Sequence, residues 1–312
     1  MALRKFLILR KLRSSCLEGR TAPIQQIFNS FTRSFAGVTR VARAFSAKTS
    51  NTFARRGTES ESGERAVQRE ATSPRVGAQE KSVNEPLDNP IWHALVGPHA
   101  GFAFGRGAAR HYPRDIAPFS GIAEPMAAAY RDLAADLPPG FEARLFRPTD
   151  EAVPPMWETV SSRPIVQMVA DRTIPEPAPI GGVVSLGEAD ADEMLALAAA
   201  ARPGPFDRRT VLLGNYVGVR REARLVAMAG ERFRLPGYVE LSAICVHPDW
   251  RGMGFGSGLT QYLAHRASAD GEVPFLHVFP ENPAILLYAR LGFRERTRLW
   301  VLWRRPKIGS SV

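Results

Sequence analysis

A strand, a glycine-rich turn and a helix follow one another without a break between residues 239 and 271. This run restricts the possible folds most. Residues 239–246 are mostly apolar, as in a buried strand, and residues 258–269 carry apolar side chains at helical spacing before Gly271. The turn between them reads Arg251-Gly252-Met253-Gly254-Phe255-Gly256. Backbone N–H groups at such a helix start attract an anion, so the run predicts an α/β protein with an anion site.

The glycine spacing excludes two common nucleotide sites. A dinucleotide-binding turn, G-x-G-x-x-G, would need a glycine at position 257 or 259, where the chain has Ser257 and Leu259. The Lys-Ser/Thr pair of a P-loop is also absent. Because Arg251 can add a charge-assisted bond to a phosphate, we interpret the turn as a pyrophosphate cradle of another kind.

Two motifs in this part of the chain resemble one known family. The R-x-x-G-x-G run of residues 251–256 resembles the acyl-CoA-binding loop of the Gcn5-related N-acetyltransferase (GNAT) superfamily. After a helix and a strand, residues 282–293 read N-P-A-I-L-L-Y-A-R-L-G-F, which resembles the second signature of that superfamily. Residues 225–251, with Gly-Glu-Arg at 230–232 and Ile-Cys-Val-His-Pro at 244–248, further resemble its FR47-like branch.

The resemblance covers residues 181–305 and implies the acyl-CoA N-acyltransferase fold. We expect a mixed, mostly antiparallel, twisted sheet flanked by helices and splayed where the cofactor enters. Hydrophobic periodicity in this region indicates the order β-α-β-β-β-α-β-α-β. The expected strands cover residues 183–186, 215–220, 225–234, 239–246, 275–279 and 299–304. The expected helices cover residues 190–201, 258–269 and 282–291.

The chain before this region divides into two parts. Residues 83–180 hold 15 of the 25 prolines, which break long helices and central strands. They predict a small irregular N-terminal subdomain, followed by an N-acetyltransferase domain at 181–308. The clearest elements of the N-terminal subdomain are a helix at residues 126–137 and short strands at 143–147 and 165–169. We expect this subdomain to shape the acceptor pocket.

Residues 1–82 are interpreted as a basic, low-complexity extension that is disordered. The chain has a formal net charge of +10, yet residues 1–58 hold 12 Lys and Arg against one acid, Glu18. The other 254 residues carry a net charge of −1, which argues against nucleic acid as a partner of the core. The extension has three open interpretations: upstream sequence read from a mis-called start, a targeting segment, or a nucleic-acid or membrane-binding arm. We therefore expect a cytoplasmic protein, or a mitochondrial or other organellar one if residues 1–58 are a transit peptide.

Cysteine and histidine usage excludes several other classes of protein. Two cysteines, Cys16 and Cys245, cannot build a disulfide scaffold or an all-cysteine zinc site, and the six histidines show no ligand spacing. No apolar run approaches the roughly 18 residues of a membrane span. We expect no metal and no membrane span, and the oligomeric state stays open.

The resemblance also implies roles for individual residues. Main-chain groups of Ile244, Cys245 and Val246 would pair with the pantetheine arm of the cofactor. Asn282 would fix that arm or the helix end, and Tyr288 would lie near the thioester sulfur as a candidate general acid. The pyrophosphate would be held by the amides of Arg251, Gly252, Met253, Gly254, Phe255, Gly256 and Ser257.

Glu240 is the candidate general base. Strand alternation predicts that Glu240, Ser242, Ile244 and Val246 share one face of their strand. Each assignment has an alternative. Tyr288 could only pack its helix, Asn282 could be a plain N-cap, Cys245 could be a buried apolar residue, and a water chain could replace Glu240.

The implied activity is transfer of an acetyl or other acyl group from acyl-CoA to an amine. The acceptor would be a small molecule or a peptide, and nothing in the sequence names it. A catalytically silent CoA-binding sensor or interaction module is the alternative.

Overall fold

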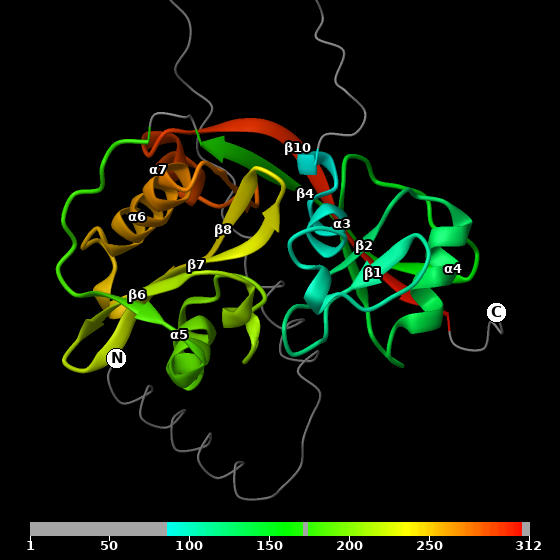
Figure 1. Cartoon of the computed structure of the whole chain (residues 1–312), viewed down its shortest axis with the longest axis horizontal. Coiled ribbons are helices and arrows are strands. Elements are labelled where there is room, and N and C mark those ends of the chain that lie inside the picture. The colour runs from blue at the N-terminus through cyan, green and yellow to red at the C-terminus, as the bar shows by residue number, and fades with distance from the viewer. Residues whose placement is uncertain (1–85, 171–173, 308–312) are drawn as a thin grey trace, which may run out of the picture. The chain divides into compact units, whose positions relative to one another are not determined.

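Eight strands form one mixed sheet in the computed structural model, which describes residues 86–170 and 174–307 (Figure 1). Their order is β3-β10-β4-β9-β8-β7-β6-β5, and every neighbouring pair is antiparallel except β8 and β9. The predicted mixed, mostly antiparallel sheet is therefore confirmed. The strands are β3 (Ala143–Arg147), β4 (Trp157–Ala170), β5 (Val183–Leu186), β6 (Tyr216–Arg221), β7 (Arg224–Leu235), β8 (Tyr238–Val246), β9 (Val273–Val278) and β10 (Phe293–Pro306).

Most elements start and end near their predicted residues. β3 and β5 have the predicted bounds, and α6 (Phe255–Ala269) starts three residues earlier than expected. The glycine turn therefore runs directly into the first helical residue. The other α-helices are α3 (Pro90–Leu95), α4 (Ala127–Asp136), α5 (Ala191–Ala201) and α7 (Ala284–Arg290).

Strands β4 and β10 are much longer than predicted. The expected strands at residues 165–169 and 299–304 lie mostly in the second halves of two 14-residue strands that pair along their whole length. The many prolines of residues 83–180 predict only short strands there, and the length of β4 departs from that prediction. Pro164 is tolerated because it lies where β4 pairs with β10 alone, before the pairing with β9 begins at Val166.

The sheet joins both parts of the chain that were predicted to be separate. β3 and β4 come from the predicted subdomain at 83–180, and β10 of the following region lies between them. Every described residue falls within one compact unit. The predicted extension at 1–82 lies outside the described residues, as do residues 83–85 and 308.

Helices cover the two faces of the sheet, each over its own apolar core. One core contains Leu259 and Leu263 of α6, Tyr288 of α7, and Leu241 and Val278 of the sheet. The opposite face carries a second core around α3, with Leu87, Ile91, Phe146, Phe233 and Phe275. A further core is shared by β3, β10, α4 and the small sheet of β1 (Ala109–His111) and β2 (Ser120–Ile122).

A bulge in β8 changes which residues share a face. Ala243 has a φ of 52°, and the register with β7 shifts between the pairs Met228–Cys245 and Gly230–Ser242. Leu241 therefore packs into the same core as Ile244 and Val246, while Ala243 packs toward α5 with Cys245. The predicted shared face of Glu240, Ser242, Ile244 and Val246 is wrong, because simple alternation does not continue through a bulge.

The two parallel strands part soon after they begin. β8 and β9 pair only from Tyr238 to Glu240 and from Val273 to Phe275. Residues 241–246 of β8 are left with no partner on that edge among the described strands. Within the part of the chain that the structure describes, no helix is long and apolar enough to cross a membrane.

Candidate active site

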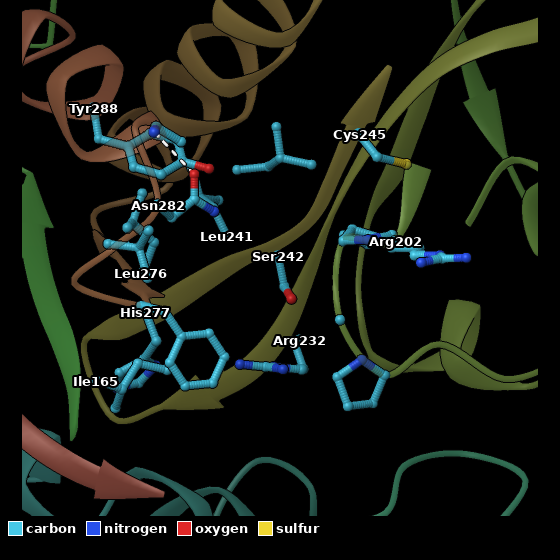
Figure 2. Close-up of a pocket in the computed structure, with 18 of the residues that line it drawn as sticks. Ile165, Arg202, Arg232, Leu241, Ser242, Cys245, Leu276, His277, Asn282 and Tyr288 are labelled. Atoms are coloured by element: carbon cyan, nitrogen blue, oxygen red, sulfur yellow. Dashed lines mark hydrogen bonds between the residues drawn. The ribbon is translucent and has the colours of Figure 1, made fainter. Parts of the chain in front are cut away.

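A cavity of about 640 Å³ opens where β8 and β9 part (Figure 2). Residues 241–246 of β8 and 276–279 at the end of β9 form its sides. Figure 2 shows Tyr288 and Asn282 on one side, Cys245 and Arg202 on the other, and Arg232 and His277 at one end. The predicted site residues that line the cavity are Ile244, Cys245, Val246, Arg251, Gly256, Asn282 and Tyr288.

The glycine turn has the geometry of an anion site. Gly252 and Gly254 have φ values of 81° and 80°, and Gly254 is the N-cap of α6. The first helical bond runs from the Gly258 N–H to the Gly254 carbonyl, so the N–H groups of residues 255–257 have no partner within the helix. Arg251 and Gly256 line the cavity beside this turn. The chain can take this path because glycine carries no Cβ to oppose a positive φ.

Other residues of the turn lie outside the cavity lining. Gly252, Met253, Gly254, Phe255 and Ser257 belong to the turn but do not line the cavity itself. The Met253 side chain is exposed, Phe255 packs into the core, and the Ser257 hydroxyl donates to the Gly254 carbonyl at 2.8 Å. Only their main chain is therefore placed to serve an anion.

We expect Gly254→Ala to weaken acetyl-CoA binding about 10-fold, because it strains the turn that presents the helix N–H groups. The matched control is Gly271→Ala at the other end of α6. Gly271 has a φ of 79°, and a Cβ added at either position would meet no atom closer than 3.9 Å. Each substitution should cost about 1–2 kcal/mol of unfolding free energy. Calorimetry that finds equal Kd values for the two variants would contradict a cofactor role for the turn.

Tyr288 lies on α7, and Asn282 precedes the first residue of that helix, beside the cavity. The Asn282 Oδ1 accepts a hydrogen bond from the Ala284 N–H at 2.9 Å, so this side chain fixes the start of the helix from the position before its N-cap, Pro283. Tyr288 is buried, its ring lies edge-on to that of Phe293, and its side chain lines the cavity. Burial raises the pKa of the Tyr288 phenol to about 12. The phenol is therefore a hydrogen-bond donor throughout the neutral range.

Glu240 lies in a buried ion pair and does not line the cavity. The Arg232 Nε donates to its Oε2 at 2.8 Å, and the Arg232 Nη2 donates to its Oε1 at 2.6 Å. The His277 Nδ1 donates to the same Oε1 at 2.6 Å. Burial alone would raise the pKa of Glu240, but the charge of Arg232 and the bonds from both partners outweigh it and lower the pKa to about 2. Such a carboxylate is a poor proton acceptor for an amine.

His277 is also fully engaged. Its Nε2 accepts a hydrogen bond from the Gln167 Nε2 at 3.1 Å, and that nitrogen donates in turn to the Leu87 carbonyl at 2.8 Å. Burial lowers the pKa of His277, with the charge of Glu240 opposing the shift. The ring is thus neutral, with its proton on Nδ1 and both nitrogens bonded.

Cys245 is a buried residue of β8 with a protonated thiol. Burial raises its pKa to about 12, and its side chain packs with Met194 and Leu197 of α5. This agrees with the alternative in which Cys245 is an apolar core residue. Its main chain, with that of Ile244 and Val246, forms the unpaired edge of β8 on the cavity.

Several cavity residues were not found by sequence reasoning. Arg232, His277, Arg144 and Trp303 come from four different strands, and the curved sheet brings them to one cavity. No motif surrounds Arg144 or Trp303, so no signal in the sequence could have singled them out. Among the described residues, no group of three or more His, Cys, Asp or Glu is placed to hold a metal ion.

Comparisons with known proteins agree with this geometry. The family model for FR47-like proteins matches residues 216–301, from the first residue of β6 into β10. A solved structure of a GNAT-family protein from Novosphingobium aromaticivorans is 36% identical and has a TM-score of 0.67, over 72% of this chain and 100% of that chain. A GCN5-related N-acetyltransferase from Kribbella flavida is 19% identical with a TM-score of 0.48, over 70% of this chain and 95% of that chain.

A search of the curated proteins found no match. The relationship therefore rests on the family model and on the Novosphingobium structure, which the chain spans completely. The chain belongs to the Gcn5-related N-acetyltransferase (GNAT) superfamily, in its FR47-like branch.

Proposed function

We propose that this protein transfers an acetyl or other acyl group from acyl-CoA to an amine by direct attack on the thioester. The observation that carries the proposal is the cavity at the parting of β8 and β9, which has the glycine turn and α6 on one side and Tyr288 within it. Membership of an acetyltransferase family supports the same reaction class.

The residues present fit an acyl-CoA. The unpaired edge of β8 at residues 241–246 offers N–H and C=O groups to an amide-containing arm, as an added strand would use them. The turn at residues 251–256 then lies at the end of that strand, where a pyrophosphate would follow. Gly256 lines the cavity at this point, and a Cβ added there would stand in van der Waals contact with the Val246 Cγ2 at 3.5 Å.

In the proposed reaction, the nitrogen of the neutral amine attacks the thioester carbonyl carbon and forms the C–N bond. The C–S bond then breaks and the thiolate leaves. Tyr288 donates a hydrogen bond to the sulfur as negative charge develops on it. Because the phenol pKa of about 12 exceeds the roughly 8.5 of a thiol, the proton lost by the attacking amine completes the thiol instead. Tyr288 thus stabilises charge rather than ending the reaction deprotonated.

No Asp or Glu is among the described residues that line the cavity. The acceptor therefore enters as its free base or loses its proton to water. A water chain in place of Glu240 is the alternative base that the sequence left open. We expect kcat/KM to rise about 10-fold per pH unit up to the pKa of the acceptor itself, and to level off there. The measurement is CoA release by the full chain, with a thiol reagent, over a panel of amines whose pKa values differ by about two units.

An inflection that stays at one pH for every amine would instead indicate a titrating base on the protein. If acetyl-CoA binds but no amine in the panel releases CoA between pH 7 and 9, the proposed transfer is overturned. The CoA-binding sensor would then be the better interpretation.

A further inference from the structure

The side of the cavity away from the glycine turn is built by the N-terminal part of the chain and the last strand. Phe119, Phe146 and Ile165 lie there with Val301 and Trp303 of β10. The Phe146 ring lies 4.7 Å from that of His277, and the Arg232 guanidinium lies 5.8 Å from the Phe146 ring. These contacts connect this wall to the buried ion pair at the base of the cavity. It is the space that an acceptor would occupy under the proposed function.

The charges around the cavity all have one sign. Four arginines line it, at positions 144, 202, 232 and 251, and no described carboxylate does. Three of them are accounted for by their surroundings. Arg232 is neutralised by Glu240, Arg251 lies at the anion turn, and Arg202 is the exposed C-cap of α5. Arg144 is the guanidinium with no such explanation.

Arg144 lies on β3, two residues from Phe146 and so on the same face of the strand. Its guanidinium carbon lies over the Trp303 ring, 4.0 Å from the ring centre, in a cation–π contact with the wall. Its Nε is buried and has no hydrogen-bond partner. No carboxylate of the described residues lies within ion-pair distance, and the nearby Glu142 pairs with Arg305 instead.

An uncompensated guanidinium in a half-buried wall is costly without a ligand. Burial lowers the pKa of Arg144, with the charge of Glu142 opposing the shift, yet a guanidinium stays charged at neutral pH. A second cost concerns the acceptor, because a simple protonated amine is repelled by a cavity lined with arginines alone. One anionic group on the acceptor would offset both costs. A planar carboxylate matches the fork of a guanidinium in shape and charge.

We propose that the acceptor is an amine that also carries a carboxylate, such as a free amino acid, and that Arg144 stacked on Trp303 binds this carboxylate. The inference rests on the proposed acyl transfer and names the substrate class for the same cavity. Arg144 contacts the acceptor as a binding and specificity-determining residue and takes no part in bond making.

The test compares acceptors in matched pairs, each amino acid with its own amide, at equal concentrations of free amine. We expect the wild type to favour the carboxylate over the amide about 10- to 100-fold in kcat/KM, mainly through KM. Arg144→Met should reduce this preference to about one, because it lowers kcat/KM for the carboxylate much more than for the amide. Arg144→Lys, which keeps the charge but not the fork, should retain part of the preference.

The control is Arg298→Met, which removes an exposed arginine of β10 outside the cavity lining and should leave the preference intact. A second measurement needs no turnover. Compared with CoA alone, CoA together with an N-acetyl amino acid should raise the Tm of the wild type further, but not that of Arg144→Met. Equal use of acid and amide by the wild type, or an unchanged preference or Tm shift in Arg144→Met, overturns the inference. If amines without a carboxylate still release CoA, the proposed acyl transfer stands even though this inference fails.

Discussion

Replacing Tyr288 with phenylalanine is expected to lower kcat about 100- to 1,000-fold and to leave the Kd for acetyl-CoA within about twofold. The substitution removes one hydroxyl from a buried ring and keeps its packing against Phe293. Without that donor, the charge that develops on the leaving sulfur meets an apolar wall. Steady-state CoA release measures kcat, and calorimetry with acetyl-CoA measures the Kd separately.

The control for this substitution is Tyr262→Phe, which removes a hydroxyl from a tyrosine of α6 that is 36% exposed. It should change kcat by less than about twofold. Because burial raises the pKa of Tyr288 to about 12, the wild type should show no loss of activity from this group below about pH 11. A kcat of Tyr288→Phe within threefold of wild type would reduce Tyr288 to a packing residue of α7.

Replacing Glu240 with glutamine is expected to lower the unfolding free energy by about 3–5 kcal/mol. Glu240 is fully buried and holds Arg232, whose side chain is only 10% exposed. Removing the carboxylate leaves that guanidinium buried without its partner, among the rings of Phe119 and Phe233. Urea unfolding at pH 7 measures the loss.

The double variant Glu240→Gln with Arg232→Met should recover most of this stability, because it removes both charges together. If Glu240 were the catalytic base, the single variant would lose activity and keep its stability. That result would restore the sequence-based assignment and contradict a structural role.

The effect of Glu240 should depend on pH in a defined direction. Its pKa is lowered in the folded chain from an ordinary 4.5 to about 2. A lowered pKa stabilises the folded state above the unfolded value, and this contribution disappears as the carboxylate is protonated. The stability difference between wild type and Glu240→Gln should therefore be constant above about pH 5 and shrink between pH 4.5 and 2.

Local patterns in the sequence were sufficient for most of the elements and for the glycine turn beside the cavity. The turn at residues 251–256 could be recognised because glycine, strand and helix signals lie next to one another in the chain. The bond by which Asn282 fixes the start of α7 follows equally from its neighbours, since it is to an amide two residues away. Interactions of this range depend on backbone preferences that each short segment carries by itself.

Two features of the fold depend on neighbours outside their own segment of the chain. The bulge at Ala243 is set by the register between β7 and β8, and it removed Glu240 from the face that alternation had predicted. The lengths of β4 and β10 are set by their mutual pairing. This pairing tolerates Pro164 because the other side of β4 has no partner strand at that residue. Neither cause can be read from the segment in which it acts.

By itself, the sequence determined the α/β class, the order of the elements in residues 181–305, and a glycine turn that leads into a helix. Tertiary structure alone decided the electrostatics of the cavity. It brought Arg232 and His277 onto Glu240 across three strands, and it set Arg144 of β3 on Trp303 of β10, far apart in the sequence. The physical reason is that burial and pairing of charges depend on neighbours distant in sequence, whereas turns and caps depend on neighbours along the chain.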